Sequence, residues 1–204
     1  MNEIADGFKR FKQDVFPVRA ELFARLATVH RPTALFIGCS DSRVVPELIT
    51  QREPGELFVI RTAGNLVPPY APGADGIAAS IEYAIGVLGV ADVVLCGHSD
   101  CGAMTALASD GSLDRLPAVA GWLRHADAAK ARTDAEQHAT RADRVAALVR
   151  ANVRGQLANL MTHPVVVRAL AQRTVRLHGW VYDIGSGAVE ELDSAEGQFV
   201  ALAG

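Results

Sequence analysis

Residues 34–43 read A-L-F-I-G-C-S-D-S-R, and this stretch decides which fold the chain is expected to adopt. The apolar run at residues 34–37 predicts a buried strand. A cysteine, a carboxylate and a guanidinium follow it directly, as Cys39, Asp41 and Arg43. In open α/β sheets, ligands bind at the carboxyl ends of the strands. We therefore expect a functional site at the end of this strand.

A second apolar run, at residues 93–96, leads to the sequence H-S-D-C at residues 98–101. The two residues between His98 and Cys101 allow both side chains to reach one ion. Cys39 joins them if the two strand ends are neighbours, as parallel strands of one sheet allow. Two thiolates and one imidazole suit Zn²⁺ and leave a fourth position for water or substrate, as in catalytic zinc sites. The alternative is that the cysteines are buried small residues and the histidine a loop residue.

Asp41 and Arg43 add a carboxylate and a cation beside the predicted metal. The carboxylate has two possible roles, either as a fourth ligand or as a hydrogen-bond acceptor for metal-bound water. The guanidinium would hold the carboxylate in a bidentate pair and keep it ionised at neutral pH. The alternative is an ion pair at the surface, which contributes little to stability.

Composition bounds the remaining function classes. The chain has 204 residues, half of them hydrophobic, and a net charge of −3. Dispersed basic residues do not predict nucleic-acid binding. No apolar run approaches the ~20 residues of a membrane span, and the N-terminus lacks the apolar core of a signal peptide. We expect a cytoplasmic protein, in which three cysteines do not predict a disulfide framework.

Alternating strand and helix patterns predict a single α/β domain over residues 1–204. We expect a central, mainly parallel sheet, with four parallel strands and one C-terminal antiparallel strand, flanked by helices. Residues 1–30 are expected to form an N-terminal helical arm, interrupted at Pro17. Its apolar residues share one face, which packs either on its own domain or on a neighbouring subunit; they are Ile4, Phe8, Phe11 and Val15.

These motifs together resemble the β-class carbonic anhydrases. The resemblance rests on C-S-D-S-R at 39–43 and C-G-H-S-D-C-G-A at 96–103, and it extends through P-G-E-L-F-V-I-R-T-A-G-N at 54–65 and H-G-W-V-Y-D-I at 178–184. The segments G-F-K-R-F at 7–11 and Q-L-A-N-L-x-T-H-P at 156–164 are most similar to the bacterial enzymes encoded with cyanate-degrading genes, within the plant-like branch.

The resemblance implies a role for each matching residue. Cys39, His98 and Cys101 would bind Zn²⁺, while Asp41 and Arg43 would form the catalytic dyad that orients zinc-bound hydroxide. Substrate-binding positions of the family match Gly102, through its backbone N–H, and a small apolar CO₂ pocket lined by Phe58, Ala63 and Tyr83. Plant-type members have a glutamine where this chain has His30, which would donate the same hydrogen bond, take part in proton transfer, or lie outside the pocket.

The implied function is zinc-dependent, reversible hydration of CO₂ to bicarbonate and a proton, by attack of zinc-bound hydroxide. A further implied role is the supply of bicarbonate for cyanate degradation. Two alternatives stay open: hydrolysis of CS₂ or COS on the same zinc site, and a non-catalytic structural zinc module. The family also implies a homodimer or higher homo-oligomer, with the N-terminal helices packed on the partner subunit, and no nucleic-acid or membrane partner.

Overall fold

The computed structural model describes residues 2–73, 75–109, 111–193 and 195–202. The chain divides into two compact units, Met1–Arg31 and Pro32–Gly204. The first unit is helical, and its segments are α1 (Asn2–Arg10), a π-helical turn (Phe11–Val15), a 3₁₀ turn (Pro17–Arg19) and α2 (Ala20–Leu26). The rings of Phe11, Phe16 and Phe23 contact one another within this unit. The prediction that this arm packs on a partner subunit stays a prediction.

The second unit is built on one six-stranded sheet with the strand order β2-β1-β3-β4-β5-β6. Its strands are β1 (Ala34–Cys39), β2 (Leu57–Thr62), β3 (Asp92–His98), β4 (Arg176–Tyr182), β5 (Val189–Leu192) and β6 (Phe199–Ala201). The first four strands are parallel to one another, and β5 and β6 follow as an antiparallel meander. The predicted α/β fold with four parallel strands is confirmed.

The sequence predicted one C-terminal antiparallel strand, and the structure corrects this number to two, because β6 pairs with β5. The turn before β6 is closed by a hydrogen bond from the Gly197 N–H to the Asp193 carbonyl, 2.8 Å long. The strand is only three residues long and two of its residues are exposed. Such a short edge strand lacks the alternating pattern from which strands are recognised.

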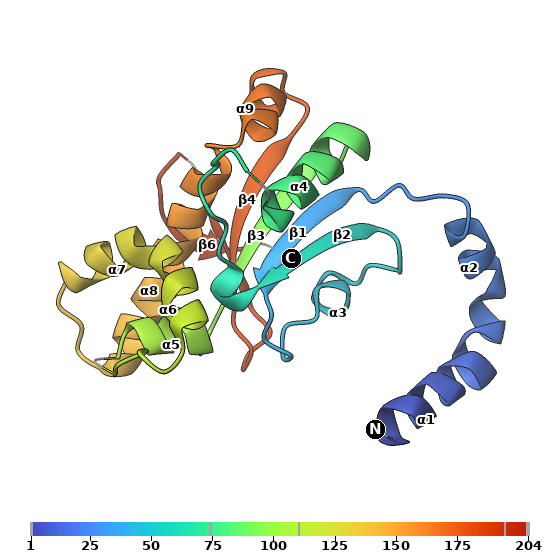
Figure 1. Ribbon diagram of the computed structural model, residues 1–204, viewed down its shortest axis with the longest axis horizontal. Coiled ribbons are helices and arrows are strands. Elements are labelled where there is room, and N and C mark those ends of the chain that lie inside the picture. Colours follow the sequence, from blue (N-terminus) through green and yellow to red (C-terminus); the bar gives the residue numbers. More distant parts are fainter. Residues whose placement is uncertain (1, 74, 110, 194, 203–204) are drawn as a thin grey trace. The chain divides into compact units, whose positions relative to one another are not determined.

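Helices follow the parallel strands along the chain, as the βα alternation predicts (Figure 1). They are α3 (Pro46–Thr50), α4 (Gly76–Glu82, continued by a π-helical turn at Tyr83–Val87), α5 (Gly102–Leu107), α6 (Pro117–Leu123), α7 (Asp127–Asp134), α8 (Arg141–Leu160) and α9 (Pro164–Ala171). Short 3₁₀ segments lie at Ala63–Asn65 and Arg124–Ala126. The long helix α8 begins with a capping box between Thr140 and Asp143.

The main hydrophobic core joins α4, α5, α8 and α9 to the sheet face that carries Leu35, Ile37 and Leu95. A smaller cluster on the other face contains Phe36, Val94 and Cys96. Helix α8 packs closely on the sheet at Gly97, which has no side chain. A Cβ at this position would stand only 2.9 Å from Cγ2 of Val153. This packing brings the polar residues of α8 near the ends of β1 and β2.

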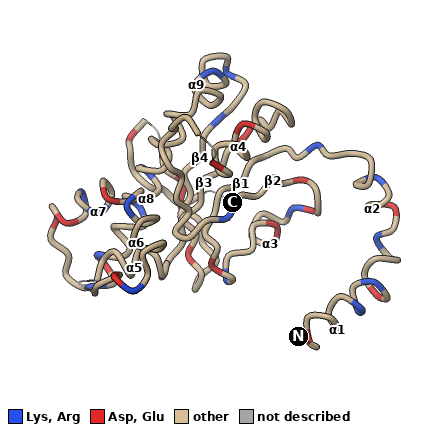
Figure 2. The backbone as a smooth tube through the Cα atoms, in the orientation of Figure 1, with Lys and Arg blue, Asp and Glu red and all other residues tan. Residues whose placement is uncertain are grey.

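No helix among the described residues is long and apolar enough to cross a membrane. Acidic and basic residues both occur throughout the chain, on most helices and several loops (Figure 2).

Candidate metal centre

The ends of β1 and β3 bring Cys39, His98 and Cys101 together, as predicted. The two strands are neighbours, with Gly38 paired to Cys96. One ligand atom from each of the three side chains lies within 4.8 Å of the others. All three residues are buried, at 6%, 0% and 1% exposure. The three side chains therefore converge at the C-terminal edge of the parallel sheet.

The histidine presents one ring nitrogen to this group. Nδ1 of His98 lies 2.9 Å from the Ser99 carbonyl oxygen, to which it donates when protonated. Nε2 is buried and has no hydrogen-bond partner among the described residues. Buried polar atoms without partners are rare in proteins, and a ligating histidine commonly donates its other N–H to a carbonyl. The orphaned Nε2 beside two cysteines therefore fits a metal ligand.

The two thiols differ in acidity. Hydrogen bonds from Cys101 and from the backbone N–H groups of Asp41 and Gly64 lower the pKa of Cys39, against the opposing effect of burial. The hydrogen bond with Cys39 raises the pKa of Cys101, and burial raises it further. A bound cation would stabilise the thiolate form of both sulfurs. The donor set, two sulfurs and one imidazole nitrogen, is the type that Zn²⁺ prefers.

Asp41 lies beside this group and is held by Arg43. The Arg43 Nε donates to Oδ1 of Asp41 at 3.0 Å, and its Nη2 donates to Oδ2 at 2.8 Å. The Arg43 backbone N–H also donates to Oδ1 at 2.9 Å. These bonds hold the pKa of the Asp41 carboxyl well below its usual range. The carboxylate thus stays ionised at neutral pH, in the bidentate geometry that the sequence predicted.

Two residues that sequence reasoning left without a role support this dyad. Asp100 accepts from Arg43 Nη1 through Oδ2 and from Nη2 through its backbone carbonyl, both at 3.0 Å. Arg61, on β2, donates to the Cys39 carbonyl at 3.0 Å and to the Asp41 carbonyl at 2.5 Å. Arg61 is paired with Gly38 in the sheet. In the sequence, the role of Arg61 was indicated only by the place of a basic residue near the end of a predicted buried strand.

The loop after β2 is tied to α8 by three amide side chains, of which those of Asn152 and Gln156 are buried. Asn152 donates to the Gly64 carbonyl at 3.0 Å, and Gln156 accepts from the Val67 N–H at 2.8 Å. Asn159 donates to the Val67 carbonyl at 2.8 Å. This loop contacts the group of Cys39, His98 and Cys101 directly, because the Gly64 N–H donates to Sγ of Cys39 at 3.3 Å.

The predicted substrate-binding residues are placed on several elements. The rings of Phe58 and Tyr83 lie with centroids 6.0 Å apart. Ala63 follows β2 directly, and Gly102 is the first residue of α5, next to Cys101. His30 is an exposed residue of the first unit. The roles of these five residues stay predictions.

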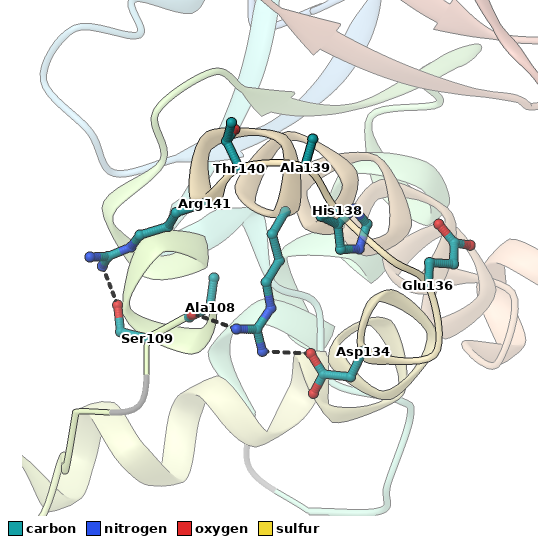
Figure 3. Close-up of a pocket in the computed structure, with 9 residues that line it drawn as sticks. Ala108, Ser109, Asp134, Glu136, His138, Ala139, Thr140 and Arg141 are labelled. Atoms are coloured by element: carbon teal, nitrogen blue, oxygen red, sulfur yellow. Dashed lines mark hydrogen bonds and ion pairs between the residues drawn. The ribbon is translucent and has the colours of Figure 1, made fainter.

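A separate cavity of about 570 Å³ lies around the start of α8 (Figure 3). Its two arginines are engaged within the protein. Arg144 donates to Asp134 at 2.7 Å and to the Ala108 carbonyl at 3.0 Å. Arg141 donates to the Ser109 hydroxyl. Cys39, His98 and Cys101 are not among the residues that line this cavity.

Comparison with known proteins shows to which family this chain is similar. A family model described as carbonic anhydrase matches residues 34–189. The chain is 64% identical to a carbonic anhydrase of Pseudomonas aeruginosa, over 100% of this chain and 92% of that protein. It is 56% identical to carbonic anhydrase 1 of Escherichia coli O157:H7, over 100% and 93% of the two chains.

Solved structures agree in fold. The β-carbonic anhydrase CcaA superposes with a TM-score of 0.94 at 39% identity, covering 100% of this chain and 92% of that one. One of two tetrameric β-carbonic anhydrases from Sordaria macrospora superposes with a TM-score of 0.75 at 32% identity, covering 99% and 95%.

Proposed function

Since the chain belongs to the β-class carbonic anhydrase family, we propose that it catalyses the reversible hydration of CO₂ to bicarbonate and a proton. The observation that carries the proposal is the buried group of Cys39, His98 and Cys101, with its orphaned imidazole nitrogen. We propose that these three residues hold Zn²⁺, because two thiolates and an imidazole match its ligand preference.

Zinc held by these residues would supply a Lewis acid that lowers the pKa of water to roughly 7, and so a nucleophile at neutral pH. That value belongs to a carbonic anhydrase whose zinc has three histidine ligands. Two thiolates donate more charge to the metal than two imidazoles do. Cys39 and Cys101 are therefore expected to move the pH at which turnover is half-maximal upward.

Asp41 is proposed to orient the nucleophile. As an ionised carboxylate it is an acceptor only, so it can take a hydrogen bond from the attacking water or hydroxide without giving one back. Arg43 keeps it in this form, since three hydrogen bonds from Arg43 reach its two oxygens. Asp41 would then position the nucleophile without removing its proton as a base.

Stopped-flow measurement of CO₂ hydration, with zinc content determined on the same sample, tests the proposal. We expect turnover that scales with bound zinc and disappears on its removal by a chelator. Equal activity in metal-free protein would overturn the proposal. A paired assay with CS₂ and COS decides the hydrolase alternative, and absence of turnover in fully zinc-loaded protein would favour a structural module.

Three finer statements extend the proposal. We propose that the protein is a homodimer or higher homo-oligomer, supported by the tetrameric relatives and the exposed apolar side chains of α1. We propose a cytoplasmic role in supplying bicarbonate for cyanate degradation, supported by the motifs at residues 7–11 and 156–164. Loss of growth on cyanate after deletion of the gene, restored by added bicarbonate, is the expected result.

A further inference from the structure

One peptide group links an indole ring to a cysteine of the metal centre. The Ala63 carbonyl accepts a hydrogen bond from Nε1 of Trp122 at 2.9 Å. The Gly64 N–H donates to Sγ of Cys39 at 3.3 Å. The Ala63 carbonyl and the Gly64 N–H belong to the same planar amide, which is polarised along its length. Trp122 and Cys39 therefore bind the two ends of one dipole.

The backbone at this amide requires a glycine at residue 64. Gly64 has a φ of +74°, and a Cβ there would stand 2.9 Å from Cβ of Ala103 and 3.1 Å from Cε of Met104. The next carbonyl, that of Gly64, is held by Asn152 at 3.0 Å. The amide thus has a hydrogen-bond partner for its carbonyl, for its N–H and for the carbonyl that follows.

Trp122 is held independently of this loop. It lies on α6, is half-buried and packs against the main hydrophobic core. Its ring also meets that of His125 edge to face, with centroids 5.2 Å apart. The indole N–H is therefore a fixed donor at which the Ala63 carbonyl is aimed.

We propose that Trp122 is a positioning residue for the metal centre, acting through the Ala63–Gly64 peptide on Cys39. Its N–H holds the peptide so that the Gly64 N–H points at the sulfur, and by polarising the amide it makes that N–H a stronger donor. A stronger N–H···S bond withdraws charge from the thiolate, as hydrogen bonds around metal ligands generally tune the metal. The inference rests on the metal binding proposed above.

Trp122→Phe tests this link because it keeps a six-membered aromatic ring and removes the N–H. Trp180→Phe is the matched control, because Nε1 of Trp180 is buried without a hydrogen-bond partner in the described part of the chain. In Co²⁺-loaded protein, the charge-transfer band from thiolate to cobalt should move to longer wavelength in Trp122→Phe only. An unmoved band, or the same shift in both variants, would overturn the proposal.

A second measurement needs no metal. In ¹⁵N-labelled metal-free protein, the Gly64 amide proton resonance should move upfield in Trp122→Phe and stay in place in Trp180→Phe. This result separates the inference from the proposed function: a protein that binds no metal contradicts the proposed function, while the Gly64 resonance still reports whether Trp122 acts on this peptide. An unmoved Gly64 resonance in Trp122→Phe overturns the inference.

If Trp122→Phe does not fold, the inference is tested by NMR on the wild-type protein. Two couplings across hydrogen bonds are expected, one between Nε1 of Trp122 and the carbonyl carbon of Ala63, and one between the Gly64 amide proton and bound ¹¹³Cd. Both couplings support the chain of contacts. The absence of either one from otherwise well-resolved spectra would overturn it.

Discussion

Oδ2 of Asp41 lies 4.0 Å from Nε2 of His98. The carboxylate therefore borders the candidate metal-binding group, which His98 forms together with Cys39 and Cys101 and without Asp41. Its other contacts are to Arg43, which occupies both oxygens. This arrangement leaves Asp41 next to the proposed metal site, with its orientation set by Arg43.

Asp41→Asn should leave zinc content unchanged and lower kcat by roughly 10–100-fold, the range found when groups that orient metal-site chemistry are replaced. The amide carries an NH₂ group where the carboxylate had an acceptor, so it cannot receive Arg43 at both atoms. Stopped-flow CO₂ hydration and elemental analysis measure the two quantities. Full turnover in this variant would remove Asp41 from the mechanism.

Asp100→Asn is the matched control, because it makes the same chemical change in the other carboxylate that Arg43 binds. The Asp100 side chain is 79% exposed. Exposed ion pairs contribute about 0–1 kcal/mol, so kcat should change by less than about fivefold. Asn also tolerates the left-handed backbone of this residue, whose φ is 53°. Equal losses in the two variants would argue that the charge of the loop, and not the position of Asp41, matters.

Cys39→Ser should remove bound zinc and, with it, CO₂ hydration. A serine hydroxyl is not ionised at neutral pH and is a hard ligand, unlike the thiolate that zinc prefers. Cys96→Ser is the matched control, because it makes the same substitution in a cysteine outside the metal-ligating group. Cys96 is fully buried, donates to the Gly97 carbonyl at 3.3 Å and has a pKa raised by burial to about 12. The control should keep full zinc content, and loss of zinc in both variants would point to a general loss of folding.

The sequence predicted that Cys39, His98 and Cys101 converge because the signals for this are local. Each ligand-bearing segment follows an apolar run, and parallel strands place their ends at one edge without further information. The contacts that refine the site carry no such signal. Arg61, Trp122 and Asn152 reach the loops of Cys39 and Gly64 from positions 22 to 88 residues away. No spacing or periodicity relates residues that meet only in the folded chain.

Gly64→Ala should destabilise the protein by at least about 1–2 kcal/mol, since that is the cost of a left-handed backbone for a residue with a Cβ. The contacts with Ala103 and Met104 add to this cost. Gly155→Ala is the contrast, because Gly155 lies inside α8 and a Cβ there meets no atom within 4 Å. It should stabilise by about 0.5–1 kcal/mol. Urea unfolding of both variants measures the difference, and equal midpoints would contradict the argument.

Phe8→Asp should reduce the oligomer to a smaller species. Ile4 and Phe8 are 82% and 65% exposed within this chain, and apolar side chains gathered on one helix face are typical of an interaction surface. Light scattering coupled to size-exclusion chromatography measures the mass. Gln13→Asp adds the same charge to the other face of the helical segment and should leave the mass unchanged. An unchanged mass in Phe8→Asp would contradict packing of this arm on a partner subunit.

His178 should make stability depend on pH in a region remote from the metal ligands. Its Nδ1 lies 2.7 Å from Glu191 on β5 and its Nε2 lies 3.0 Å from Asp92 on β3, which also binds Arg176. Both carboxylates accept only, so both contacts are hydrogen bonds when the ring is an imidazolium. Burial opposes this charge, but the two carboxylates outweigh it and raise the pKa of His178.

The raised pKa of His178 sets the direction in which stability changes with pH. A pKa that is higher in the folded state than its unfolded value of about 6.5 stabilises the protein fully below that value, and the stabilisation is lost as pH rises through the folded pKa. We therefore expect the free energy of unfolding to fall as pH rises from about 6.5 through the raised folded pKa, with the larger part of this fall absent in His178→Gln. Urea unfolding across this range, compared between wild type and variant, measures it. Parallel curves for the two proteins would show that the imidazolium does not join β3, β4 and β5.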